Sequence, residues 1–153
     1  MIREFNGRRP NIAPSAFVSE AAYVIGDVLI GNNSSVWPGA VIRGDCCKIE
    51  IGENTCVEDN CVVHGAVVHC HKIGNNVLIG NNATILDAAE IGSFCIIGAG
   101  SLVTTEMKIP DNSLVMGVPA KIRGQVSSKQ RLELEEGAVF YTKLAQEYRG
   151  QGL

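Results

Sequence analysis

The amino-acid sequence predicts an all-β solenoid: a left-handed, three-sided parallel β-helix followed by a C-terminal α-helix. Two observations lead to this fold class. The chain has 153 residues, of which 17 are Gly, 15 Ile and 16 Val, while aromatic residues make up only 5%. This composition favours strands and tight turns over a helical bundle. In addition, Ile or Val recurs every six residues through most of residues 12–109.

A six-residue period fits neither an amphipathic helix nor the alternation of a simple strand. It fits short strands that each point one aliphatic side chain inward and are joined by sharp turns, with three sides making a coil of about 18 residues. Gly and Asn, which tolerate left-handed turns, follow many of these positions, as in residues 73–76. The predicted inward positions are Ile30, Val36, Ile42, Ile51, Val57, Val63, Ile73, Ile79, Ile85, Ile91, Ile97, Val103 and Ile109.

The six-residue register slips twice. Three extra residues, Lys48 to Glu50, precede the repeat that begins at Ile51. Four extra residues, His69 to Lys72, precede the repeat that begins at Ile73. Because insertions in a solenoid leave as loops at its corners, often on the binding face, we expect the second loop to carry chemistry.

The repeat ends near residue 124, which predicts two units: a β-helix domain, 1–124, and a C-terminal helix, 125–153. Ser127 and Gln130 have the spacing of a capping box, and helix-forming residues follow them. We expect the helix to pack along the solenoid or to cover its open end. The predicted apolar stripe of the helix consists of Leu132, Val139, Phe140, Leu144 and Tyr148.

Composition excludes several classes of protein. A net charge of −3 and a pI near 5.6 argue against nucleic-acid binding. No apolar run is long enough to span a membrane, and the N-terminal segment lacks the apolar core of a signal peptide, so a cytoplasmic location is expected. The six cysteines are then expected to be thiols, with Cys56, Cys61 and Cys95 buried as small apolar residues.

All three histidines, His64, His69 and His71, lie within eight residues. Stacking of successive coils predicts that Arg43 and His64 lie side by side on one face, about 4.8 Å apart, with Asp45 on the same side. Glu58 and Asp59 precede His64 in its own coil. Imidazole is a common ligand of Zn, Fe, Co and Ni, so this clustering predicts a metal site, although an Arg43–Asp45 ion pair and solvated turn carboxylates are the simpler alternatives.

The same residues carry a family resemblance. Residues 36–45, Val-Trp-Pro-Gly-Ala-Val-Ile-Arg-Gly-Asp, and residues 51–64, which end in Val-Val-His, resemble the gamma-class carbonic anhydrases. The similarity continues through residues 97–103 and through Gly117-Val-Pro-Ala-Lys121. The repeats and the Gly-x-Pro-Ala-Lys motif are also shared with hexapeptide acyltransferases.

The resemblance implies a homotrimer with one metal at each subunit interface. In that family His64 matches the first metal ligand, and Arg43 and Asp45 match a pair that links subunits and orders the site. Asp59 matches an acidic residue near the metal, and Glu58 stands where the family usually has Gln.

The resemblance breaks down at the other two metal ligands. The family usually places them in a further coil, where this chain has Asn81 and Leu86. His69 has the same five-residue separation from His64 that the family's two histidines have, as though one coil were lost. His69 and His71 are therefore the candidate replacements.

The predicted function is the reversible hydration of CO2 to bicarbonate by metal-bound hydroxide at trimer interfaces, with Zn, or Fe, Co or Ni, as the metal. Arg43, Asp45, Glu58 and Asp59 would serve catalysis, and His64, His69 and His71 would bind the metal. CO2 and bicarbonate would be the small-molecule partners. The alternatives are a hexapeptide-class acyltransferase and a non-catalytic metal-binding solenoid whose site has decayed.

Overall fold

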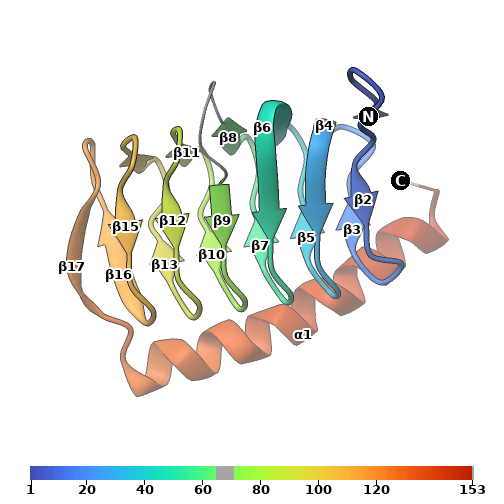
Figure 1. Cartoon of the computed structure of the whole chain (residues 1–153). Coiled ribbons are helices and arrows are strands. Elements are labelled where there is room, and N and C mark those ends of the chain that lie inside the picture. Colours follow the sequence, from blue (N-terminus) through green and yellow to red (C-terminus); the bar gives the residue numbers. More distant parts are fainter. Residues whose placement is uncertain (65–70, 153) are drawn as a thin grey trace.

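The computed structural model describes residues 1–64 and 71–152. It is a parallel β-solenoid with one long helix along its side (Figure 1). Face 1 contains β1 (Ile2–Arg3), the first parts of β4 (Tyr23–Ile30) and β6 (Val41–Ile51), β8 (Val62–His64), β11 (Thr84–Ile85) and β14 (Leu102–Val103). Face 2 contains β3 (Phe17–Val18), β5 (Ser35–Val36), β7 (Cys56–Val57), β10 (Leu78–Ile79), β13 (Ile96–Ile97), β16 (Ser113–Met116) and the antiparallel β17 (Lys121–Gln125). Face 3 contains β2 (Asn11–Ile12), the second parts of β4 and β6, β9 (His71–Ile73), β12 (Glu90–Ile91) and β15 (Lys108–Ile109).

The aliphatic residue of each short strand points into the solenoid, as the six-residue repeat predicts. On face 1, Ile42 pairs with Val63, Val63 with Ile85, and Ile85 with Val103, all in parallel register. The side chains of these four residues are fully buried. Burial of this column of methyl groups supplies the main driving force for stacking the coils. The predicted β-helix is thereby confirmed.

The corners between faces depend on left-handed backbone conformations. Asn33, Asn54 and Asn76 follow one another in successive coils, with φ values of 55°, 52° and 54°. Asparagine adopts this region more readily than most residues, which explains its recurrence. At Gly52, a Cβ would lie 2.5 Å from the carbonyl oxygen of Gly74, so the close approach of adjacent coils requires glycine there.

The first insertion lies earlier in the chain than the repeat predicts. Gly26 pairs with Gly44 and Val28 pairs with Ile49, so the extra residues fall between Gly44 and Ile49 and not at Lys48–Glu50. Ile49 is fully buried, and its inward position holds it in the face 3 strand. The extra residues therefore lie within residues 45–48, directly after the segment that carries Arg43.

The second insertion ends before His71, two residues earlier than the repeat predicts. His71 and Lys72 belong to β9, where they pair with Ile49 and Glu50 of β6. The register of face 3 therefore resumes at His71, and both residues belong to a strand and not to a loop. The rest of that insertion, including His69 and Cys70, lies outside the described residues.

The C-terminal helix, α1 (Ser128–Gly150), runs along face 2 (Figure 1). The predicted capping box is present: Ser127 Oγ accepts a hydrogen bond from the Gln130 backbone, and Gln130 Oε1 accepts one from the Ser127 backbone. Arg131 near its start donates to Asn112, and Arg149 near its end donates to the Ala16 carbonyl. The helix therefore spans the stack from the last coils back to the first.

The predicted apolar stripe of the helix is wrong in part. Leu132, Val139 and Phe140 are exposed by 54%, 55% and 58%. The face that docks carries Leu134, Tyr141, Leu144, Ala145 and Tyr148, and all of these except Leu134 pack in one cluster with Phe17, Trp37 and Cys56 of the solenoid. The aromatic side chains of face 2 determine which helix residues dock. The helix sequence alone does not reveal this choice.

Candidate functional site

The stacking of β6 on β8 brings Arg43 beside His64, as the coil comparison predicts. Both follow an inward aliphatic residue, Ile42 or Val63, and so both point outward from face 1. The side chain of Asp45, two residues beyond Arg43, lies next to both Arg43 and His64. Arg43 donates to Asp45 Oδ2 through both Nη2, at 2.7 Å, and Nε, at 3.2 Å. The expected Arg43–Asp45 pair is confirmed as a contact within one chain.

The environment of Asp45 favours its ionised form. Burial of the carboxylate opposes ionisation, but the hydrogen bonds and charge of Arg43 outweigh it, so the pKa of Asp45 lies below its usual value. The same hydrogen bond raises the pKa of Arg43. Asp45 Oδ1 is buried and accepts no hydrogen bond from the described part of the chain. A buried anionic oxygen in this state is a site for a cation or a polar donor.

The imidazole of His64 lies between two carboxylates. Its Nε2 is 3.9 Å from Asp45 Oδ1, and its Nδ1 is 3.9 Å from Asp87 Oδ1. Sequence reasoning missed Asp87. The signal was available in the register, because Val63 pairs with Ile85 and this places residues 86 and 87 next to His64.

Glu58 and Asp59 occupy the corner that follows β7. Glu58 Oε1 accepts a hydrogen bond from the Tyr141 hydroxyl at 2.8 Å, and Oε2 accepts one from the Asn81 backbone at 3.0 Å. Burial, together with the bond to Glu58, raises the pKa of Tyr141. Asp59 is exposed, and its backbone donates to the Asn81 side chain. The helix therefore contacts this corner directly, which the sequence did not indicate.

The predicted metal ligands are only partly visible. His69 lies outside the described residues, and only the backbone of His71 is described, in β9. Asn81 and Leu86 lie in the coil that stacks directly on the coil of His64. Among the residues that the structure describes, no three His, Cys, Asp or Glu side chains are arranged to hold a metal. His64 and the open oxygen of Asp45 nevertheless fit one side of a cation site, since an imidazole and a carboxylate are both suitable ligands.

The three cysteines that were expected to be buried lie in the core. Cys56, Cys61 and Cys95 are free thiols and buried. Burial raises the pKa of Cys56 to about 12 and that of Cys61 to about 11. Thiols with such pKa values are poor nucleophiles and poor metal ligands near neutral pH.

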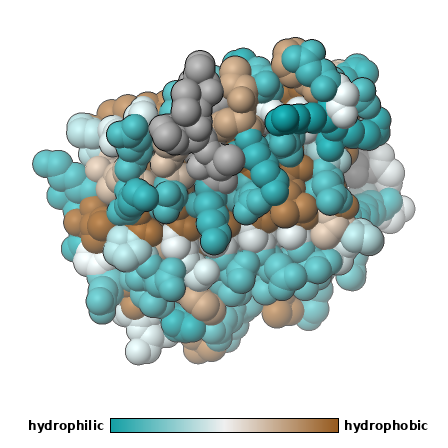
Figure 2. Space-filling model, viewed as in Figure 1, coloured by the Kyte–Doolittle hydropathy of each residue, from teal (hydrophilic) through white to brown (hydrophobic). Residues whose placement is uncertain are grey.

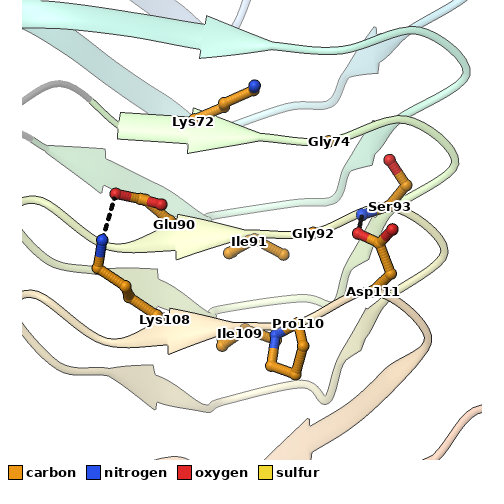
Figure 3. Close-up of a pocket in the computed structure, with 10 residues that line it drawn as sticks. All are labelled: Lys72, Gly74, Glu90, Ile91, Gly92, Ser93, Lys108, Ile109, Pro110 and Asp111. Atoms are coloured by element: carbon orange, nitrogen blue, oxygen red, sulfur yellow. Dashed lines mark hydrogen bonds and ion pairs between the residues drawn. The ribbon is translucent and has the colours of Figure 1, made fainter.

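A groove of about 530 Å³ runs over face 3, away from Arg43, Asp45 and His64 (Figure 3). Charged side chains alternate across face 3: Glu50, Lys72, Glu90 and Lys108 occupy neighbouring positions in successive strands, and the last three of these line the groove. Lys108 pairs with Glu90 at 2.9 Å. Hydrophilic residues also cover much of the surface visible in Figure 2. Such alternation is the expected pattern of a sheet face in contact with water.

No helix among the described residues combines the length and apolar character needed to cross a membrane.

Comparisons with known proteins agree with this organisation. Residues 71–105 match the family described as bacterial transferase hexapeptide (six repeats). The chain is 43% identical over 152 residues to a Methanocaldococcus jannaschii protein named "Probable carbonic anhydrase", covering 88% of this chain and 96% of that one. It is 31% identical to the mitochondrial gamma carbonic anhydrase 2 of Arabidopsis thaliana, over 91% of this chain and 58% of that protein. A solved hexapeptide transferase family protein from Anaplasma phagocytophilum has a TM-score of 0.80 at 34% identity, with 97% and 98% of the two chains covered.

Proposed function

The chain belongs to the gamma-carbonic-anhydrase-like family of hexapeptide-repeat proteins, and we propose that it catalyses the reversible hydration of CO2 to bicarbonate with a bound metal. The observation that carries this proposal is the arrangement of Arg43, Asp45 and His64 on face 1. Arg43 fixes one oxygen of Asp45, and the other oxygen remains buried beside Nε2 of His64.

We propose that His64 holds the metal, with His69 and His71 as the candidate further ligands. A bound divalent metal would supply an activated water near neutral pH. Arg43 keeps Asp45 ionised, so that a negative charge compensates the cation. Hydrogen bonds from Tyr141 and from the Asn81 backbone fix the orientation of the Glu58 carboxylate. A carboxylate held in this way is suited to position a polar group at the corner that follows β7. Asp59, which is exposed, is suited to exchange protons with solvent.

We propose that the active protein is a homotrimer assembled through face 1. Face 2 is covered by α1, and face 3 carries the alternating charges of the groove in Figure 3. Face 1 instead presents a half-buried row that is mostly apolar, formed by Tyr23, Val41, Val62, Thr84 and Leu102, next to His64. Contact through this row would bring the site of one subunit against its neighbour, so that a partner subunit could complete the ligand set.

The test is metal analysis of protein purified without chelator, combined with a CO2 hydration assay. We expect about one metal ion per chain in the wild type, and we expect His64→Ala to lose most of that metal together with hydration activity. Glu90→Gln is the matched control, because it removes a charge from face 3 and leaves face 1 unchanged. A metal-free wild-type trimer, or undiminished hydration in His64→Ala, would refute the proposal.

Two alternatives have specific support. The solved transferase-family structure at 34% identity favours an acyltransferase that uses an acyl-CoA donor, and failure to bind CoA would exclude it. The presence of Asn81 and Leu86 where the resemblance calls for histidines favours a non-catalytic metal-binding solenoid. Bound metal without hydration activity would support that second alternative.

A further inference from the structure

A small cavity lies between α1 and face 2, apart from the residues of the candidate site on face 1. Its volume is about 90 Å³. Apolar groups form most of its wall, and the residues that matter here are Cys56, Val77 and Leu78 of the solenoid and Leu134, Gly137 and Tyr141 of the helix. The cavity is therefore a place where an apolar group of a ligand can leave water.

Gly137 is the reason that this space is open. It lies on the docking face of α1 between Leu134 and Tyr141, yet a Cβ at this position would meet no atom within 4 Å. Its backbone is helical, so neither crowding nor a left-handed conformation requires glycine there. Glycine destabilises a helix interior relative to alanine. A residue that lowers stability without a packing reason is expected at a functional site.

A groove of about 460 Å³ along one side of α1 adjoins the cavity, because Asn54, Asn76 and Ala138 line both. Asn54 and Asn76 are half-buried, and their side-chain amides make no hydrogen bond within residues 1–64 and 71–152. The mouth of the cavity thus offers polar groups that are available to a ligand.

The uncompensated charge beside the cavity is positive. Glu133 lines the cavity and pairs with Lys129 at 3.8 Å, and Glu135 lines the groove and pairs with Arg131 at 3.6 Å. Lys143 also lines the groove, and it pairs with no carboxylate in the part of the chain that the structure describes. The charge balance therefore favours an anionic ligand.

We propose that the cavity binds the tail of a short aliphatic carboxylate, and that Asn54, Asn76 and Lys143 hold the carboxylate group. An apolar cavity of about 150 Å³ accommodates benzene, so this cavity accommodates a tail of about three or four carbon atoms. The two amides and the ammonium group all donate hydrogen bonds to carboxylate oxygens. Because Tyr141 lines the cavity and also donates to Glu58, the ligand contacts a side chain that orients that carboxylate.

The experiment is an NMR titration of the backbone amides of the full chain with straight-chain carboxylates from acetate to octanoate. We expect saturable shifts at Gly137 and Ala138. The dissociation constant should fall about fourfold for each added methylene up to pentanoate, and then level off because the cavity is full. Absence of saturable shifts at these residues, or affinity that keeps rising through octanoate, would overturn the proposal.

Two substitutions at Gly137 test the cavity itself. Gly137→Ala should raise the urea midpoint of unfolding, because alanine favours the helix, and its methyl group should move the levelling-off to butyrate. Gly137→Leu should fill the space and abolish the shifts. Carboxylate binding that is the same as in the wild type in both variants would show that the ligand lies elsewhere.

Lys143→Met tests the charge and should weaken every carboxylate about two- to fivefold, without changing the gain per methylene. Lys72→Met, which removes the same charge from face 3, is the matched control, and equal weakening in both variants would contradict the role of Lys143. The inference does not depend on the proposed function, so His64→Ala should bind butyrate as the wild type does. Loss of binding in His64→Ala would place the carboxylate on face 1 and refute the assignment.

Discussion

At the scale of single residues, the candidate site depends on the partly exposed ion pair between Arg43 and Asp45. Arg43 is half-exposed and Asp45 is largely covered, so the pair is screened on one side only. Its value for stability is small, about 1 kcal/mol or less, because exposed ion pairs contribute little. In the proposed function its role is larger, since Arg43 keeps a largely covered carboxylate ionised beside His64.

Replacing Arg43 by Met should make stability less dependent on acid pH. In the wild type the lowered pKa of Asp45 contributes stability above the unfolded-state pKa of about 3.9, and this contribution is lost as the pH falls through the folded-state value. Without Arg43, the hydrogen bond and charge that do most to lower the pKa of Asp45 are lost, whereas burial still acts to raise it. We expect Arg43→Met to lower the free energy of unfolding by about 1 kcal/mol or less at neutral pH and by less near pH 3, as measured with urea.

Arg8→Met is the matched control, because Arg8 pairs with Asp27 at 3.1 Å in a more exposed setting. Equal losses for Arg43→Met at both pH values would contradict the assigned role of Asp45.

At the scale of elements, aromatic contacts with face 2 hold α1 against the solenoid, and the predicted apolar stripe of the helix does not. Trp37 contacts Tyr141 and Tyr148 with ring centroids 5.4 and 5.5 Å apart, and Phe17 adds a further edge contact to Tyr148. These aromatic contacts hold the hydroxyl of Tyr141 within hydrogen-bond distance of Glu58. Helix docking and the corner of the candidate site are therefore physically linked.

Removing the hydroxyl of Tyr141 tests this link. Tyr141→Phe keeps the ring in its aromatic cluster but deprives Glu58 Oε1 of its donor. We expect a loss of about 1–2 kcal/mol in the free energy of unfolding, since hydrogen bonds to charged groups are stronger than neutral ones. Tyr148→Phe, which removes a hydroxyl from the same helix face, provides the comparison in denaturant unfolding. If the two variants lose equal stability, the Glu58 bond has no special importance.

The spacing of the coils can be tested at one glycine. A Cβ at position 52 would overlap the backbone of Gly74, so Gly52→Ala should push adjacent coils apart. We expect a loss of roughly 2–3 kcal/mol, at the upper end of ordinary point substitutions. Gly124→Ala is the control, because a Cβ there meets no atom within 4 Å. Thermal unfolding measures both variants, and similar melting temperatures would refute the steric explanation.

At the scale of the whole molecule, the three faces differ in what covers them. Face 2 is covered by α1, face 3 is lined with paired charges, and face 1 is apolar next to His64. A charged residue in the outward row of face 1 should therefore dissociate the proposed trimer, since an unpaired charge is costly to bury.

We expect Val62→Glu to yield monomers in light scattering after size-exclusion chromatography, whereas Lys72→Glu on face 3 should leave the trimer intact. A wild-type monomer, or a trimer that persists in Val62→Glu, would show that face 1 is not the interface.

Much of the fold follows from local sequence. One inward aliphatic residue per six, with Asn or Gly at the corners, determines the coil, because each position must satisfy both burial and turn geometry. This is why the neighbours Arg43 and His64 could be predicted from stacking alone. The division into units of residues 1–124 and 125–153 stays a prediction.

The sequence by itself thus determined the solenoid, the stacking of coils and the residues that begin the candidate site, because these depend on a repeated local rule. Only the tertiary structure decided where the insertions lie, which helix side chains dock, and that Tyr141 reaches Glu58. These contacts join segments whose separation in the chain follows no period. Their geometry depends on which buried residues, such as Ile49 and Trp37, hold the register and the docking surface in place.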